Sequence, residues 1–162
     1  MRSVQVVSTE GPSGVRVTEA PEPVRDAGEV LVEVHALGVS WPDLLLSRGQ
    51  YQLKPETPFQ LGVDFAGVVR EAPDGSGHAP GDRVACCLPY GGGADLVTAP
   101  ADAVFPLPDA VSFEKAAALP MNYLTAQFAL ATRAQLREGE TVLVHGAAGG
   151  VGTATLQVAK GY

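Results

Sequence analysis

Residues Thr141–Gly152 read T-V-L-V-H-G-A-A-G-G-V-G. The segment begins with a short apolar, β-branched run, Thr141–His145, which predicts a buried strand. A glycine-rich turn follows at once, and apolar residues then recur at helical spacing over residues 151–160. A strand, a glycine turn and a helix in this order form the context in which a phosphate-binding fingerprint functions.

The turn carries the pattern A-x-G-x-x-G at Ala147, Gly149 and Gly152. In this pattern Ala147 makes the tight turn, Gly149 lets a pyrophosphate approach the backbone, and Gly152 lets the helix pack on the strand. The expected dinucleotide contacts are Ala147, Gly149, Gly150, Val151 and Gly152. The alternative is a purely structural turn. The acidic or basic residue that separates the two readings is expected about 20 residues further on, beyond Tyr162.

Composition limits the class of protein. The chain has 162 residues, 46% hydrophobic and 18% charged, which is typical of a soluble globular protein with one or two domains. Its net charge of −7 argues against nucleic acid and anionic membranes as partners, because both attract clustered Lys and Arg. There is no apolar run of membrane-spanning length and no signal-peptide pattern, so we expect a cytoplasmic protein that binds no membrane.

The first hundred residues are typical of β structure. Short β-rich runs predict strands at residues 4–8, 15–18, 29–37, 62–70, 83–88 and 94–98. Residues 42–48 begin with Pro42 and predict one or two helical turns. Several short strands at regular spacing indicate a compact barrel.

Helical patterning begins at Ser112, which predicts an N-cap. A second helix is expected from Pro120 to about Ala134. One apolar face of it is expected to contain Leu124, Phe128 and Ala131. The change of composition predicts two domains, residues 1–112 and 113–162.

Four segments occur in an order that is characteristic of one superfamily: GVDFAGVV at 62–69, PGDRV at 80–84, LTA at 124–126 and VHGAAGGVG at 144–152. Together they resemble the medium-chain dehydrogenase/reductases, and specifically their zinc-free quinone oxidoreductase branch. The resemblance implies an α/β protein. It places a GroES-like, β-barrel-type catalytic domain over 1–112 and the first strand and helix of an NAD(P)-binding Rossmann domain over 113–162.

The same resemblance implies an NAD(P)H-dependent oxidoreductase that reduces a quinone, an enone or a similar activated carbonyl compound. NADPH is the expected cofactor, with NADH as the alternative, and a homo-oligomer is expected. Two other functions stay open. The chain could be an enoyl-reductase segment of a polyketide or fatty acid synthase, or a non-catalytic barrel that acts as a binding or interaction module.

No zinc is expected. The zinc alcohol dehydrogenases of the superfamily place Cys where this chain has Ser40 and His-Glu where it has Val63-Asp64. A catalytic zinc needs three protein ligands and an open position, and these residues cannot supply them. Cys86 and Cys87 are adjacent, so in a strand they point to opposite faces and are poor co-ligands.

The resemblance also implies the catalytic side chains. Arg48-Gly49-Gln50-Tyr51 resembles a family segment whose Tyr lies near the nicotinamide and the substrate, so Tyr51 is a candidate hydroxyl donor. Ser40 stands where the family often has Asn, and Thr125 resembles a Thr that contacts the nicotinamide, with Asn122 as a weaker cofactor contact. The alternatives are a surface loop tyrosine for Tyr51 and, for Thr125, a bond to its own i−4 carbonyl.

A dinucleotide-binding fold needs two βαβαβ halves, and only one strand and one helix are predicted here. We therefore expect the chain to be part of a longer reductase. By itself it is expected to bind NAD(P)H weakly or undetectably and to turn over no quinone.

Overall fold

The computed structural model describes all 162 residues, Met1–Tyr162, and divides into two compact units, Met1–Ala118 and Leu119–Tyr162. The sequence placed the boundary between residues 112 and 113. The first unit extends further because helix α2, Phe113–Ala116, belongs to it. Two alanines at its end, Ala116 and Ala117, pack with Ala66 and Ala85 of the sheet in one small buried cluster.

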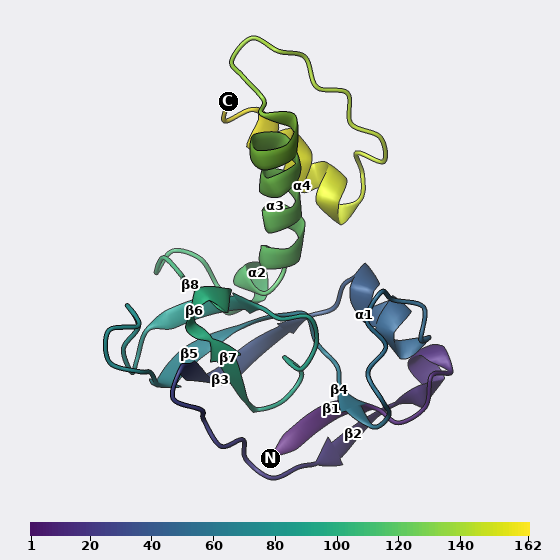
Figure 1. Ribbon diagram of the computed structural model, residues 1–162, viewed down its shortest axis with the longest axis vertical. Coiled ribbons are helices and arrows are strands. Elements are labelled where there is room, and N and C mark those ends of the chain that lie inside the picture. The colour runs from purple at the N-terminus through teal and green to yellow at the C-terminus, as the bar shows by residue number, and fades with distance from the viewer. The chain divides into compact units, whose positions relative to one another are not determined.

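The first unit contains two antiparallel sheets (Figure 1). One sheet has the strand order β2-β1-β4, with β1 at Arg2–Val6, β2 at Val15–Glu19 and β4 at Phe59–Gln60. The other has the order β7-β3-β5-β6-β8, with β3 at Glu29–Gly38, β5 at Asp64–Glu71, β6 at Arg83–Cys87, β7 at Leu96–Pro100 and β8 at Val104–Pro106. All six strands predicted in the first hundred residues are confirmed, each within a few residues. The two shortest strands, β4 and β8, were not predicted.

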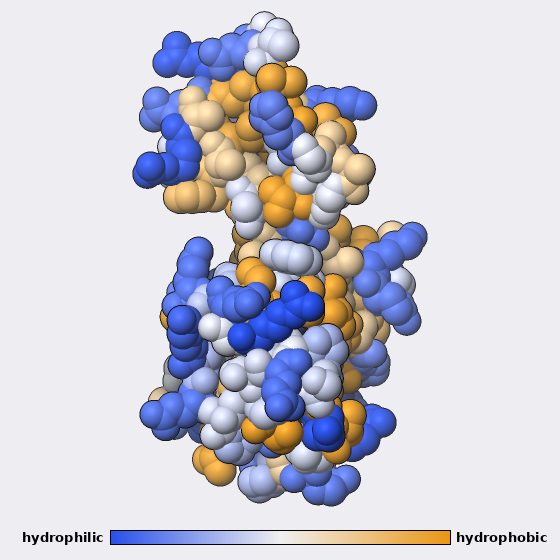
Figure 2. All heavy atoms as spheres, turned by 90° about the vertical axis from the view of Figure 1, so that its right-hand side faces the viewer, coloured by the Kyte–Doolittle hydropathy of each residue, from blue (hydrophilic) through white to orange (hydrophobic).

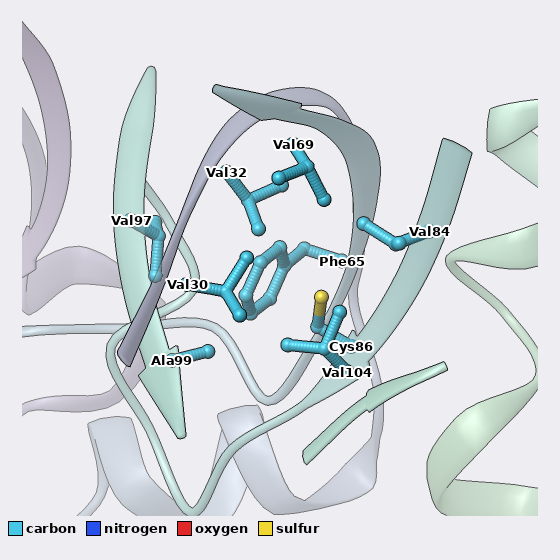
Figure 3. Packing of buried hydrophobic residues seen from close by; sticks show 9 residues of the cluster. All are labelled: Val30, Val32, Phe65, Val69, Val84, Cys86, Val97, Ala99 and Val104. Carbon is cyan, nitrogen blue, oxygen red and sulfur yellow. The ribbon is translucent and has the colours of Figure 1, made fainter. Parts of the chain in front are cut away.

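The five-stranded sheet curves around a core with the Phe65 ring at its centre (Figure 3). The other members of the core are Val30, Val32, Val69, Val84, Cys86, Val97, Ala99 and Val104. Most are two residues apart along their strands, the spacing that places side chains on one face of a sheet. Each fully buried Val or Phe contributes about 1.5–3 kcal/mol relative to an exposed one, so this cluster stabilises the curved sheet.

Short helices complete the first unit. They are the 3₁₀ turns η1, Gly11–Gly14, and η2, Ala101–Ala103, together with α1, Trp41–Ser47, and α2. The helix expected at 42–48 is therefore confirmed. The predicted N-cap Ser112 is confirmed too, since its Oγ accepts a hydrogen bond from the Lys115 N–H at 3.4 Å.

The second unit contains helix α3, Pro120–Gln127, the π-helix η3, Phe128–Ala134, and helix α4, Gly150–Ala159. The helix predicted from Pro120 to Ala134 is present, but its second half is π-helical. It ends at Gln135, which has a left-handed φ of 54°, and the Leu136 N–H donates to the Leu130 carbonyl at 2.9 Å.

Helices α3 and α4 pack on each other, and Ala126 and Ala154 are buried. On the predicted apolar face of the long helix, Leu124 is 44% and Phe128 56% accessible. Figure 2 shows such apolar side chains, in orange, on the surface of this unit. No helix in the structure combines the length and the apolar character that crossing a bilayer requires.

The buried strand predicted at Thr141–His145 is wrong. Residues 141–144 have no regular structure, His145–Ala148 form a turn, and the Leu143 side chain is 81% exposed. A strand is stabilised by ladder hydrogen bonds to a neighbouring strand, and none lies beside this segment. The β-branched residues of this segment favour a strand, but no neighbouring strand is present to pair with it.

Candidate functional site: a glycine turn at the start of helix α4

The turn before α4 reverses the chain at Gly146, which has a φ of +66°. The Gly149 N–H donates to the Gly146 carbonyl at 3.0 Å, and the Thr153 N–H donates to the Gly149 carbonyl at 2.8 Å. The residue in the left-handed conformation is thus Gly146, not Ala147, to which the sequence pattern assigned the tight turn. Gly146 bears this conformation without strain because it has no Cβ.

Gly149 and Gly152 differ in the space around them. A Cβ on Gly149 would meet only the Gly146 carbonyl oxygen, at 3.4 Å, so the space before the helix is open. A Cβ on Gly152 would collide with that same oxygen and lie 2.7 Å from the Ala147 Cα. Gly152 therefore packs the helix onto the turn, whereas the sequence pattern had it packing onto a strand.

The open side of Gly149 suits an anion. The N–H groups of a helix's first turn have no acceptor within the helix and carry a partial positive charge. Here that turn consists of Gly150, Val151 and Gly152. A phosphate placed before Gly149 can accept hydrogen bonds from these groups.

Helix α3 supplies two of the predicted side chains. The Asn122 carboxamide lies against Gly150, where an added Cβ would be 2.7 Å from Oδ1 and 3.0 Å from Nδ2. The exposed Thr125 hydroxyl donates to the Met121 carbonyl at 2.6 Å, the i−4 bond of the alternative interpretation. Because its proton is used in this way, Thr125 can still accept a hydrogen bond but has none to donate.

Ser40 forms the N-cap of α1. Its N–H and its hydroxyl both donate to Asp43 Oδ2, at 2.8 and 2.9 Å, and the two residues form a reciprocal capping box. Asp43 is 2% exposed, and its Oδ1 has no hydrogen-bond partner. The sequence interpretation missed Asp43, although the spacing S-x-x-D before an apolar run is the signal for this cap.

Tyr51 lies in the bend that follows α1. Its side chain is half-buried, and its hydroxyl makes no hydrogen bond within the chain. The hydroxyl is therefore available to donate to a bound molecule. Ser40 and Tyr51 belong to the first unit, whereas Asn122, Thr125 and the glycine turn belong to the second.

Two of the three positions at which the zinc alcohol dehydrogenases carry zinc ligands offer no available ligand here. Val63 is fully buried and has no ligand atom, and Ser40 is committed to its cap. Asp64 is buried at the start of β5, opposite Cys87 on β6. No cluster of three or more His, Cys, Asp and Glu side chains that could hold a metal ion occurs.

Both cysteines are held as neutral thiols. Burial, followed by the charge of Asp64 and a hydrogen bond to its carboxylate, raises the pKa of the Cys87 thiol to about 12. Burial, with a smaller effect from Cys87, raises the pKa of Cys86 to about 12. Since the thiolate is the nucleophile and the metal ligand, neither group is prepared for either role at neutral pH.

A hollow of about 410 Å³ lies beside α1 in the first unit. Its lining is mostly apolar and includes Leu37, Val39, Leu44 and Leu61, with Asp43 as the one charged residue. Its size and composition suit a small apolar molecule.

Comparison with known proteins places the chain in a family. Residues 26–109, just over half of the chain, match the alcohol dehydrogenase GroES-like domain. The mouse quinone oxidoreductase is 39% identical over 165 aligned residues, which cover 100% of this chain and 50% of that protein. The chain thus spans about half the length of the curated quinone oxidoreductases that it matches.

Solved structures support the same family assignment. The human synaptic vesicle membrane protein VAT-1 homolog-like protein superposes with a TM-score of 0.93 at 37% identity, covering 99% of this chain and 52% of that one. The quinone oxidoreductase from Thermus thermophilus, described together with its NADPH complex, superposes with a TM-score of 0.84 at 39% identity, covering 99% and 50%. The GroES-like fold expected from the sequence is confirmed. This chain belongs to the alcohol dehydrogenase GroES-like domain family, within the quinone oxidoreductase branch of the medium-chain dehydrogenase/reductases.

Proposed function

We propose that this chain is part of a longer NADPH-dependent oxidoreductase that reduces a quinone, an enone or a similar activated carbonyl compound without zinc. The observation that carries the proposal is the open space before Gly149 at the start of α4, where an added Cβ would meet only one atom. The relatives support the oxidoreductase class, and the Thermus relative binds NADPH. NADH remains the alternative cofactor.

In this proposal the reduced nicotinamide supplies the hydride. The N–H groups of the first turn of α4 bind the diphosphate. Thr125 can accept a hydrogen bond from the nicotinamide carboxamide, since its own proton is bonded to Met121. Tyr51 has a free hydroxyl that can donate to the carbonyl oxygen of the substrate, where negative charge develops on reduction. Ser40 holds the start of α1 before Tyr51.

Substitution of Gly149 tests the cofactor site. Gly149→Val should fill the space that the diphosphate needs and remove NADPH binding, measured as shifts of the amide resonances of residues 149–152 at millimolar NADPH. Gly28→Val is the matched control, because a Cβ at Gly28 meets no atom within 4 Å. Unchanged NADPH shifts in a folded Gly149→Val protein would mean that the turn is only structural.

Zinc independence has its own test. Val63 offers no ligand atom, and Ser40 and Asp64 are used within the fold. We expect elemental analysis after dialysis to find no stoichiometric zinc. About one zinc per chain would overturn this part of the proposal.

A second candidate function is a binding module without catalysis. The hollow beside α1 favours it, because it lies wholly within the first unit and requires no cofactor. Titration of the chain with NADPH and, separately, with a simple quinone distinguishes the two. Quinone-induced shifts around Leu44 without any NADPH effect would favour the binding module.

We also propose that the protein forms a homo-oligomer. Leu124, Phe128 and Leu143 are large apolar residues that lie exposed on the second unit. Covering such residues with a second copy removes apolar surface from water. Analytical sedimentation that finds only monomer at micromolar protein concentration would contradict this proposal.

A further inference from the structure

The contact between Asn122 and Gly150 joins the first turn of α3 to the first residue of α4. All three atoms of the carboxamide head lie close to Gly150, since an added Cβ would be 2.7 Å from Oδ1 and 3.0 Å from both Cγ and Nδ2. At 2.7 Å any side chain at position 150 forces a shift. A side chain at position 150 would therefore displace the Asn122 carboxamide from its place beside the first turn of α4.

Other contacts hold the two helices in this register. The Tyr123 hydroxyl donates to the Gln157 side chain, and Gln127 Nε2 donates to the Tyr162 hydroxyl at 3.1 Å. Residues from the beginning of α4, from its last turn and from the region beyond its end thus each contact α3. The Asn122 head is set at the first turn of α4 by the packing of the whole helix pair, and not by its own contact alone.

The charge of the side chain at position 122 matters in two opposite ways. A carboxylate beside the first turn of a helix stabilises the helix, because it interacts with the positive end of the helix dipole. The same carboxylate would repel a diphosphate bound at that turn. Asn keeps the size and the hydrogen-bonding oxygen of Asp but carries no charge.

We propose that Asn122 is a positioning residue of the dinucleotide site, which holds the first turn of α4 against α3 with a neutral group and so leaves the turn free to bind a diphosphate. This rests on the cofactor site proposed above. It adds a residue from outside the glycine turn and a requirement that this residue be uncharged.

The test uses the whole 162-residue chain with ADP-ribose and inorganic diphosphate as probes. Affinity is measured from the amide shifts of residues 149–152, and helix stability from the hydrogen-exchange protection of the α4 amides. We expect Asn122→Asp to weaken both probes by about tenfold or more, while the protection of α4 stays equal or increases. A purely structural role would move affinity and protection in the same direction.

Gln127→Glu is the matched control. It makes the same amide-to-carboxylate change on the same helix, where the side chain contacts Tyr162 instead of the first turn of α4. We expect it to reduce probe affinity by less than about twofold, the screened effect of a distant charge.

A double-mutant cycle tests the contact itself. Gly150→Ala should weaken both probes, because its Cβ displaces the carboxamide. Adding Asn122→Ala should restore part of the affinity, so that the two effects are not additive.

The outcomes separate the two claims. Probe binding by the parent chain together with unchanged binding by Asn122→Asp would overturn the role of Asn122 and leave the cofactor site standing. A parallel loss of affinity and α4 protection in that variant would overturn it as well. Because weak binding is expected of this chain, both probes are added at millimolar concentration; no amide shift in the parent chain under these conditions would overturn the cofactor site and the inference with it.

Discussion

Asp64 and Cys87 face each other across β5 and β6, and neither was assigned a partner from the sequence. Cys87 appeared there as an ordinary strand cysteine and Asp64 only as a departure from a zinc-ligand pattern. The structure makes them a thiol–carboxylate pair, in which the Cys87 S–H donates to Asp64. Nothing in the local sequence signals this, because the two residues meet only through strand pairing.

Cys87 should react slowly with thiol reagents, since burial and Asp64 raise its pKa to about 12. Its thiolate fraction at pH 8 is then on the order of one in ten thousand. We expect Asp64→Asn to lower this pKa part of the way, because the charge is lost while burial, the largest cause, remains. The rate of Cys87 alkylation as a function of pH measures the shift.

The substitution Cys86→Ala is added to the parent chain and to the Asp64→Asn variant, so that only the alkylation of Cys87 is measured. An identical pH profile with Asp64 and with Asn at position 64 would show that burial alone sets the reactivity of Cys87.

At the level of elements, α2 belongs to the first unit because Arg83 of β6 holds the segment before it. The Arg83 guanidinium donates to the carbonyls of Pro108, Asp109 and Val111 at 3.2, 2.9 and 2.7 Å. It also lies 4.6 Å from the centre of the Phe113 ring. One planar side chain thereby ties a loop and the start of a helix to the sheet.

Arg83→Lys should destabilise the first unit by about 2 kcal/mol, because Lys keeps the charge but cannot make several directed hydrogen bonds at once. Urea unfolding followed by far-UV circular dichroism measures the loss. Arg70→Lys is the control, since Arg70 forms an exposed ion pair with Glu33 and such pairs contribute at most about 1 kcal/mol. Equal effects of the two substitutions would refute the anchoring role of Arg83.

At the level of the whole molecule, we expect this 162-residue chain to show no quinone turnover with NADPH. Hydride transfer requires the nicotinamide within about 3–3.5 Å of the acceptor in a defined orientation. The start of α4 can hold a diphosphate, but no strand lies beside residues 141–144 to extend that site toward the nicotinamide. The decrease of nicotinamide absorbance with time is the direct assay, and turnover at rates ordinary for an enzyme would contradict the expectation.

Local patterns were sufficient for most of the fold. Short β-rich runs predicted all six longer strands, and the helices at α1, α2 and α4 were predicted from Pro42, Ser112 and the spacing after Gly149. The ordered motifs 62–69, 80–84 and 144–152 were enough to assign the superfamily. These features depend on residues within a few positions of one another, so they can be predicted from the sequence.

Contacts between residues distant in the sequence could not be predicted and are seen only in the tertiary structure. Strands β4 and β8 have two and three residues, too few for a pattern, and exist because β1 and β6 pair with them. Thr141–Val144 has the pattern of a strand and is not one, because a strand needs a neighbour. The Asn122–Gly150 contact likewise depends on how two helices pack, and sequence spacing does not contain that information.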